Sequence, residues 1–160
     1  MSDQSQVLEI IRSGEVCLGL DDATGVEVIA TMLEQAADRG LFNPEVLPKV
    51  LRAVLNRERS ASTATPEGVA FPHCRSLYID KLCCVIGVHP KGIPFGASNG
   101  APTTIFVLML VPQEAPCVHV QLLTRLSRSL LEPAVRNEIL AATAPDQVID
   151  TLLKHAEEDN

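Results

Sequence analysis

The sequence predicts an α/β fold in which a mixed β-sheet is sandwiched between helices. Apolar residues at helical spacing alternate along the chain with short, continuously apolar runs, which is the pattern of helices and buried strands in one α/β unit. Apolar residues make up 46% of the 160 residues, enough for one buried core. No internal repeat, low-complexity tract or long linker divides the chain. We therefore expect a single domain over residues 1–160, with its core at about 7–155.

The first part of the chain is predicted to form one strand and two helices. Val16–Leu20 is a short apolar run typical of a strand, and Asp21 and Asp22 are placed to cap the helix that follows. That helix is expected to stop at Gly40, a residue favoured at helix C-termini. Asn43–Pro44 opens the next helix, because a capping residue precedes proline at the first helical position. The buried stripes of the two helices are Val26, Ile29, Ala30, Leu33 and Ala37, and then Leu47, Val50, Leu51, Val54 and Leu55.

A loop and the two main strands are predicted next. Ser60–Glu67 is rich in small polar residues, and the apolar piece Gly68–Phe71 then leads into Pro72–His73. Leu82–Val88 is typical of a buried strand, and Thr103–Val111 carries the strongest strand signal. Between these strands we expect two smaller features, which are a short strand at Ile93–Phe95 and a tight turn at Ser98–Gly100.

The last part of the chain is predicted to be helical. After Pro112 the apolar residues recur at helical spacing, and the expected stripe is Val118, Leu122, Leu123, Leu126 and Leu130. Two shorter helices are expected after this one, around Glu132–Ala142 and Pro145–Lys154.

Charge and hydropathy exclude several classes of function. The net charge of −7 argues against nucleic acid or an anionic membrane as the main partner, because both require a basic surface. Residues 1–13 lack the basic-then-apolar pattern of a signal peptide. The longest apolar run, Ile105–Val111, is too short to span a bilayer. We therefore expect a cytoplasmic protein that is not embedded in a membrane.

The five cysteines are expected to act as small buried apolar side chains. Their odd number and the lack of a signal peptide make a disulfide framework improbable. No C-x-x-C pair occurs, which weakens redox and zinc-ribbon interpretations. Cys83 and Cys84 are neighbours in a strand, so their side chains should point to opposite faces of the sheet. The cysteines are Cys17, Cys74, Cys83, Cys84 and Cys117.

His73 is the main candidate for chemistry. It follows Pro72, whose fixed φ stiffens the backbone that presents the imidazole. A neutral imidazole is a nucleophile near pH 7, and its second nitrogen can be held by a hydrogen bond. Upstream, Arg57 supplies a planar donor fork for phosphate oxygens, and the hydroxyls of Ser62 and Thr63 can add donors. On spacing alone, a partly buried structural histidine is the competing interpretation.

For each of the other three histidines, a structural or surface role competes with a functional one. His119 is expected in the first turn of its helix, where an anion nearby would be favoured, although a residue that merely faces a loop fits equally well. His89, before Pro90, is interpreted as a surface residue at a strand end. His155 lies in the charged C-terminal stretch and is expected to be solvated.

Two blocks of this sequence resemble the enzyme IIA domains of the bacterial sugar phosphotransferase system. The branch that they resemble is the fructose/mannitol type, which includes the nitrogen-regulatory IIA proteins. The resemblance covers nearly the whole chain, roughly Val7 to His155. The first block is Arg57-Glu58, Ser62-Thr63 and Gly68-Val69-Ala70-Phe71-Pro72-His73, and the second is Leu110-Val111-Pro112, His119, Leu122-Leu123 and Leu126-Ser127.

The resemblance implies a phosphocarrier without a cofactor or metal. The histidine that matches His73 would accept a phosphoryl group from the histidine-containing phosphocarrier protein. His119 would orient and stabilise the phosphorylated state, Arg57 would contact the phosphate, and Ser62 and Thr63 would contribute to phosphate binding. The acceptor would be a IIB domain or, in the nitrogen-regulatory branch, a regulatory target protein. A homodimer is compatible with the sequence. The sequence shows no segment that resembles a IIB or IIC domain, and on this ground we expect the nitrogen-regulatory type slightly more than a transport component.

The sequence departs from the family where glycines are common, at Ala64, Pro66 and Cys74. Pro66 offers no N–H and Cys74 adds bulk, so this loop is expected to be stiffer than usual. One alternative is therefore a protein-interaction regulator that keeps the fold without efficient transfer. A metal-dependent hydrolase built on His73, Cys74 and His119 lacks carboxylates at ligand spacing, and a serine hydrolase lacks its G-x-S-x-G motif.

Overall fold

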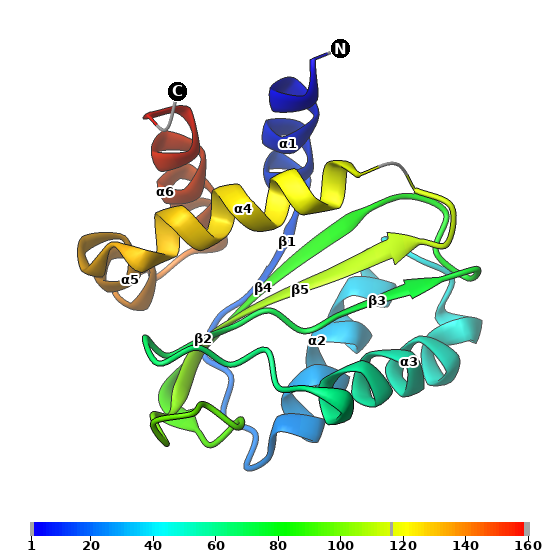
Figure 1. The fold of residues 1–160 in the computed structure, drawn as a ribbon, viewed down its shortest axis with the longest axis horizontal. Helices are drawn as coiled ribbons and strands as arrows, with labels where there is room; N and C mark the ends of the chain where they lie inside the picture. The colour runs from blue at the N-terminus through cyan, green and yellow to red at the C-terminus, as the bar shows by residue number, and fades with distance from the viewer. Residues whose placement is uncertain (1, 116, 159–160) are drawn as a thin grey trace.

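The computed structural model describes residues 2–115 and 117–158, and this part of the chain forms five strands and six α-helices (Figure 1). The helices are α1 (Asp3–Arg12), α2 (Gly25–Asp38), α3 (Leu47–Ser60), α4 (Val118–Leu131), α5 (Pro133–Leu140) and α6 (Pro145–Glu158). The strands are β1 (Glu15–Cys17), β2 (Val69–Ala70), β3 (His73–Ser76), β4 (Cys83–Ile93) and β5 (Thr103–Pro112). None of the described helices is long and apolar enough to cross a membrane.

The strands form one mixed sheet in the order β1-β4-β5-β2, with β3 also paired to β5. β1 is parallel to β4, β4 is antiparallel to β5, and both β2 and β3 are parallel to β5. The predicted mixed sheet is therefore confirmed. β4 and β5 lie in its centre and are buried on both faces, which explains why their sequences are continuously apolar rather than alternating.

Helices cover both faces of the sheet, as the sequence predicted. α1, α4, α5 and α6 pack on one face, where Ile86, Val107 and Leu126 belong to a single buried cluster. α2 and α3 pack on the other face, in a cluster that includes Met32, Val54 and Leu108 (Figure 1). Neighbouring strand residues alternate between the two clusters, so Cys83 and Cys84 do face opposite sides of the sheet.

β2 and β3 behave as one edge strand that is interrupted at Pro72. Ala70 pairs with Phe106 and His73 with Met109, so the register is the same before and after the interruption. Proline lacks an N–H and is tolerated at a sheet edge. The carbonyl of Pro72 still accepts the N–H of Met109 at 3.0 Å. This continuity fixes where His73 lies along β5.

Several boundaries and caps differ from the predictions. α1 was not predicted, because its polar residues hide the buried positions Val7 and Ile11. β1 begins at Glu15 and ends at Cys17, before the predicted end at Leu20. Thr24, rather than Asp21 or Asp22, caps α2 by accepting the N–H of Glu27. Asn43 caps as predicted, although it opens a 3₁₀ turn at Pro44–Val46 that runs into α3.

The end of β4 and two histidines also differ. Ile93 ends β4 after a register shift that follows Val88, so no separate strand forms at Ile93–Phe95. His89 is 2% exposed, and the prediction that it lies on the surface is wrong. Its Nε2–H donates to the carbonyl of Asp22 at 2.8 Å, and its Nδ1 accepts the N–H of Gly92 at 3.0 Å. His155 lies half-buried in α6 rather than in a solvated tail.

Candidate functional site

Three of the predicted site residues meet around one pocket of about 330 Å³. Arg57 comes from the last turn of α3, His73 from the start of β3, and His119 from the first turn of α4. The pocket lies where the edge strand β3 and the end of β5 meet these two helices. Its lining consists of Ala53, Arg57, His73, Cys74, Arg75, Val111 and His119.

A backbone hydrogen bond fixes the imidazole of His73. Nδ1 lies 2.9 Å from the carbonyl oxygen of Phe71. Because a carbonyl oxygen can only accept, Nδ1 carries the proton and Nε2 keeps its lone pair. The sheet register places His73 beside Met109, on the face that α4 covers. His73 is half-buried, and the hydrogen bond to Phe71 holds its ring in one orientation.

A chain of hydrogen bonds supports the carbonyl that holds His73. The N–H of Phe71 donates to the hydroxyl of Thr63 at 3.1 Å, and this hydroxyl donates to Glu58 Oε1 at 2.8 Å. The N–H of Thr63 donates to the other carboxylate oxygen of Glu58 at 2.6 Å. Glu58 lies near the end of α3. The motif residues Glu58 and Thr63 thereby fasten the segment before His73 to that helix.

Neither Ser62 nor Thr63 is among the residues that line the pocket. The hydroxyl of Ser62 donates to the carbonyl of Phe95 at 2.8 Å and accepts the N–H of Ala64 at 3.2 Å. The hydroxyl of Thr63 is used by Glu58 and Phe71. The structure therefore brings Arg57, His73 and His119 together, while both hydroxyls serve the loop that supports them.

Arg75 is a pocket residue that the sequence analysis missed. It lies two positions after His73 in β3, and alternation along a strand places both side chains on the same face. Its guanidinium lies 3.3 Å from Nε2 of His119. The signal that could have identified Arg75 is its position two residues after His73 in an edge strand, where both side chains share one face. Together Arg57 and Arg75 give this acidic protein a local pair of cations.

Cys74 lies beside His73 in the sequence but turns away from it. Its side chain belongs to the cluster on the α2 and α3 face and is 3% exposed. The expected bulk of Cys74 therefore lies on the face opposite to His73, although Cys74 still contributes to the lining of the pocket. Burial raises the pKa of the Cys74 thiol to about 11, so this thiol stays protonated near neutral pH.

The remaining cysteines are free, and they are not gathered into a metal site. Cys17, Cys83 and Cys84 are buried as expected, whereas Cys117 is exposed. Within residues 2–115 and 117–158, no three His, Cys, Asp or Glu side chains are placed to hold one metal ion.

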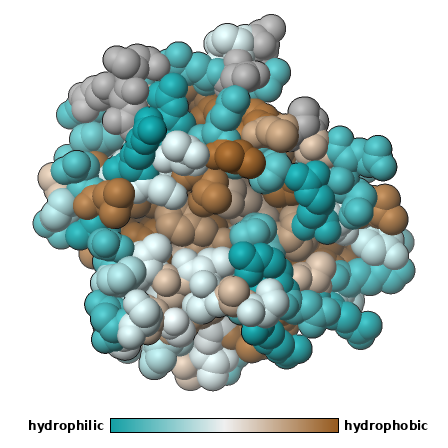
Figure 2. Space-filling view, viewed as in Figure 1, coloured by the Kyte–Doolittle hydropathy of each residue, from teal (hydrophilic) through white to brown (hydrophobic). Residues whose placement is uncertain are grey.

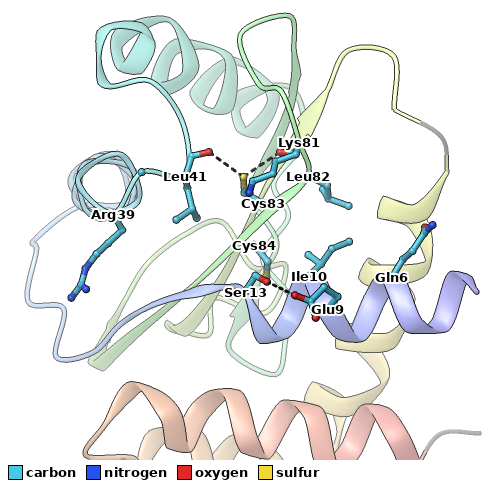
Figure 3. Close-up of a pocket in the computed structure, with 11 residues that line it drawn as sticks. Gln6, Glu9, Ile10, Ser13, Arg39, Leu41, Lys81, Leu82, Cys83 and Cys84 are labelled. Carbon is cyan, nitrogen blue, oxygen red and sulfur yellow. Dashed lines mark hydrogen bonds between the residues drawn. The ribbon is translucent and has the colours of Figure 1, made fainter. Parts of the chain in front are cut away.

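A larger cavity, of about 510 Å³, lies away from the histidines (Figure 3). It opens between α1, the turn after α2 and the start of β4. Cys83 Sγ donates to the carbonyls of Leu41 and Lys81 at 3.5 and 3.2 Å, and burial raises the pKa of its thiol. The lining thus lacks an activated nucleophile. This cavity is larger, but the histidine pair His73 and His119 and the arginines Arg57 and Arg75 line the smaller pocket, which is therefore the better candidate for a functional site.

Exposed apolar side chains lie close in the sequence to residues that line the smaller pocket. Leu77 and Tyr78 follow β3 and are 78% and 45% exposed, and Val120, next to His119, is 49% exposed. Figure 2 shows hydrophobic residues gathered across the middle of the face that is seen in Figure 1, with hydrophilic residues around them. A mixed surface of this kind, with apolar groups inside a polar rim, is typical of protein interfaces.

Comparison with known sequences matches most of the chain to one family. A family model described as "Phosphoenolpyruvate-dependent sugar phosphotransferase system, EIIA 2" matches residues 9–155. The fructose-specific EIIA component of Haloferax volcanii is 31% identical over 135 residues, which cover 84% of this chain and 86% of that protein. The fructose-specific EIIABC component of Bacillus subtilis is 25% identical over 150 residues. This chain spans 23% of its length.

Solved structures share the fold. The nitrogen regulatory protein IIA-Ntr from Neisseria meningitidis superposes with a TM-score of 0.80 at 19% identity and covers 92% of this chain and 99% of its own. The enzyme IIA of a complex with phosphorylated enzyme IIB, both mannitol-specific and from Escherichia coli, has a TM-score of 0.73 at 24% identity. That match covers 89% of this chain and 96% of the other.

Proposed function

The chain belongs to the EIIA 2 family of the phosphoenolpyruvate-dependent sugar phosphotransferase system, and we propose that it carries its phosphoryl group on Nε2 of His73. Proteins of this family are phosphotransfer relay components. The observation that carries the assignment of the residue is the bond from Nδ1 of His73 to the Phe71 carbonyl, which leaves Nε2 as the basic nitrogen. Arg57 lines the same pocket and supplies donors for the phosphoryl oxygens.

The proposed reaction is a direct transfer between two imidazoles. The lone pair on Nε2 of His73 attacks the phosphorus of a phosphohistidine on the donor protein, and the P–N bond of the donor breaks. The bonding pair returns to the donor nitrogen, so no group is oxidised or reduced. His73 keeps its Nδ1 proton, and the Phe71 carbonyl stabilises the positive charge that develops on the ring. Phosphoryl transfer of this kind depends mainly on positioning and charge stabilisation.

The proposed donor is the histidine-containing phosphocarrier protein, and the proposed acceptor is a IIB domain or a regulatory target. Leu77, Tyr78 and Val120 are exposed apolar residues next in sequence to β3 and His119, and they would offer either partner an apolar surface on which to dock. The enzyme IIA of the mannitol system has been solved with its phosphorylated IIB, which supports a IIB-like acceptor. The likeness to IIA-Ntr supports the second use, in which the phosphorylation state is itself the signal. A relay must release its partner after transfer, so we expect weak, rapidly exchanging complexes.

The test is phosphorylation of the purified protein by the upstream components. We expect incubation with phosphoenolpyruvate, enzyme I and the histidine-containing phosphocarrier protein to raise the intact mass by one phosphoryl group. His73→Ala should lose this shift, while His89→Gln serves as the control because His89 lies outside the pocket. Retention of the shift in His73→Ala would overturn the assignment. If wild type gains no mass, the protein-interaction regulator without transfer is the better interpretation.

A further inference from the structure

Arg75 is anchored much more firmly than an exposed strand residue needs to be. Its Nη1 donates to the carbonyls of Gln113 at 3.0 Å and of Pro112 and Ala115 at 3.4 Å each. These carbonyls belong to the segment that joins β5 to α4. The guanidinium is therefore fixed between the strand that carries His73 and the helix that carries His119.

The contact between Arg75 and His119 determines the tautomer of His119. A guanidinium carries only donors, so Nε2 of His119, at 3.3 Å from Arg75 Nη2, must be the acceptor. The ring proton then lies on Nδ1. This nitrogen is buried and has no hydrogen-bond partner among the described residues. The only ring nitrogen of His119 with a proton thus points into the protein, and the other has no proton to offer a phosphoryl oxygen.

We infer that Arg75 is the donor that contacts the phosphoryl oxygens on this side of the pocket, and that His119 is a positioning residue that acts through Arg75. The inference rests on the proposed phosphorylation of His73. In this arrangement His119 does not contact the phosphoryl group, contrary to what the sequence suggested, but orients the guanidinium of Arg75 that does. His119 holds one N–H of Nη2, while the second N–H of Nη2 and the Nε–H of Arg75 have no protein partner in the described chain.

The position of Arg75 suits this role. His73 and Arg75 are separated by one residue on the same face of β3, so their Cα atoms are about 7 Å apart. Both side chains line the pocket, and a guanidinium binds phosphate oxygens through two parallel N–H groups. The carbonyls at residues 112–115 hold the cation before the phosphoryl group arrives, so little reorganisation is needed during transfer.

A double-mutant cycle tests this arrangement. The rate of phosphoryl acceptance is measured by rapid quench for wild type, Arg75→Met, His119→Ala and the double variant. We expect Arg75→Met to be slower by about 10²-fold, the typical effect of removing one preorganised donor. The double variant should match Arg75→Met within about twofold, because His119 has no partner through which to act once Arg75 is gone. His119→Gln, whose side-chain carbonyl can accept from Arg75, should retain more of the rate than His119→Ala.

The control is Arg128→Met, which removes an exposed guanidinium from the last turn of α4 and should leave the rate unchanged. Circular dichroism checks that each variant is folded. If wild type is phosphorylated but the effects of the two substitutions multiply, His119 contacts the phosphoryl group independently and the inference is wrong. A rate for Arg75→Met equal to that of wild type would also overturn it. Failure of wild type itself to accept a phosphoryl group would instead overturn the proposed function, and the inference with it.

A spectroscopic measurement tests the tautomer without any transfer. Nitrogen-15 NMR of histidine-labelled protein should show His119 with its proton on Nδ1. Arg75→Met should shift the ring toward the Nε2–H tautomer, which free imidazole side chains prefer in water. These signals report the contact between Arg75 and His119 itself, and the double-mutant cycle reports its effect on transfer. Observation of the Nε2–H form in the wild-type protein would contradict the inferred contact.

Discussion

Thr63 shows how a single residue can govern the nucleophile without touching the pocket. Its hydroxyl accepts from the N–H of Phe71 and donates to Glu58. Thr63→Val keeps the shape of the side chain but leaves the N–H of Phe71 and one carboxylate oxygen without a partner. We expect the free energy of unfolding to fall by about 1–3 kcal/mol, the typical cost of one unmatched buried group, because Phe71 is buried whereas the partly exposed Glu58 carboxylate can be hydrated. The transfer rate should fall as well, because the Phe71 carbonyl loses its support.

The matched control for Thr63→Val is Thr151→Val. The hydroxyl of Thr151 donates to the carbonyl of Gln147 within α6, far along the chain from the pocket residues. Urea unfolding and rapid-quench transfer are measured for both variants. If Thr63→Val transfers phosphoryl groups at the wild-type rate, the hydrogen-bond chain from Glu58 does not control the orientation of His73.

Among the site residues, those that belong to local motifs or to the family resemblance could be predicted from the sequence. Arg57, His73 and His119 were expected together, and they do line one pocket. Arg75 was missed because its role depends on the carbonyls of residues 112–115, about 40 positions away. His89 was misjudged for the same reason, since its partner Asp22 lies far upstream. Hydrogen bonds between distant segments leave no periodic pattern in the sequence.

At the scale of an element, β4 depends on the buried His89. The strand shifts register between Val88 and Ile93, and Gly92 adopts a φ of +76° there. The imidazole of His89 donates to the carbonyl of Asp22 and accepts the N–H of Gly92, and it thereby ties this irregularity to the segment before α2. We expect His89→Leu to lower the free energy of unfolding by about 2 kcal/mol, because the partly buried N–H of Gly92 and C=O of Asp22 lose their partners.

The comparison variant for His89→Leu is His73→Ala, and the two should behave in opposite ways. His73→Ala is expected to lose phosphoryl acceptance with little loss of stability, whereas the folded fraction of His89→Leu should still accept a phosphoryl group. Urea unfolding and intact mass after phosphorylation measure both properties. Loss of acceptance in folded His89→Leu would mean that the end of β4 takes part in the site.

Element boundaries were harder to predict than the elements themselves. The caps at Asn43 and the stop near Gly40, where φ is +81°, follow from local backbone chemistry and were predicted. The cap of α2 was misplaced because Asp22 uses its carboxylate to accept the hydroxyl of Thr31. α1 was overlooked because only part of one face is buried. Whether a weak helix forms and where it begins depend on tertiary packing, and a short stretch of sequence does not contain that information.

For the whole molecule, the alternation of apolar runs and amphipathic helices was enough to predict the layers. β4 and β5 are buried on both faces, so helices had to cover both. The register of β3 on β5 could not be read from the sequence, since it depends on the continuation of the edge strand through Pro72. That register places His73 and Arg75 on the face of α4, and the site therefore emerges from the assembled sheet.

The thiols buried on both faces of the sheet should make the stability of the protein fall at alkaline pH. Burial raises the pKa of Cys17 and Cys84 to about 12 and that of Cys74 to about 11, from an ordinary value of 9.0. Between pH 9 and these higher values the unfolded chain loses thiol protons that the folded chain keeps. The unfolded state then binds fewer protons, so the free energy of unfolding must fall as pH rises.

We expect a nearly constant thiol contribution to stability below about pH 8 and a decline above pH 9. Each thiol that ionises only in the unfolded chain lowers the free energy of unfolding by about 1.4 kcal/mol per pH unit. Urea unfolding with reductant present, repeated from pH 8 to pH 11, measures the slope. Cys74→Ala should make it shallower, while Cys117→Ala, which removes an exposed thiol, should leave it unchanged. Equal slopes for Cys74→Ala and wild type would show that this thiol ionises as easily in the folded protein as in the unfolded chain, and that the core between the sheet and α3 admits water.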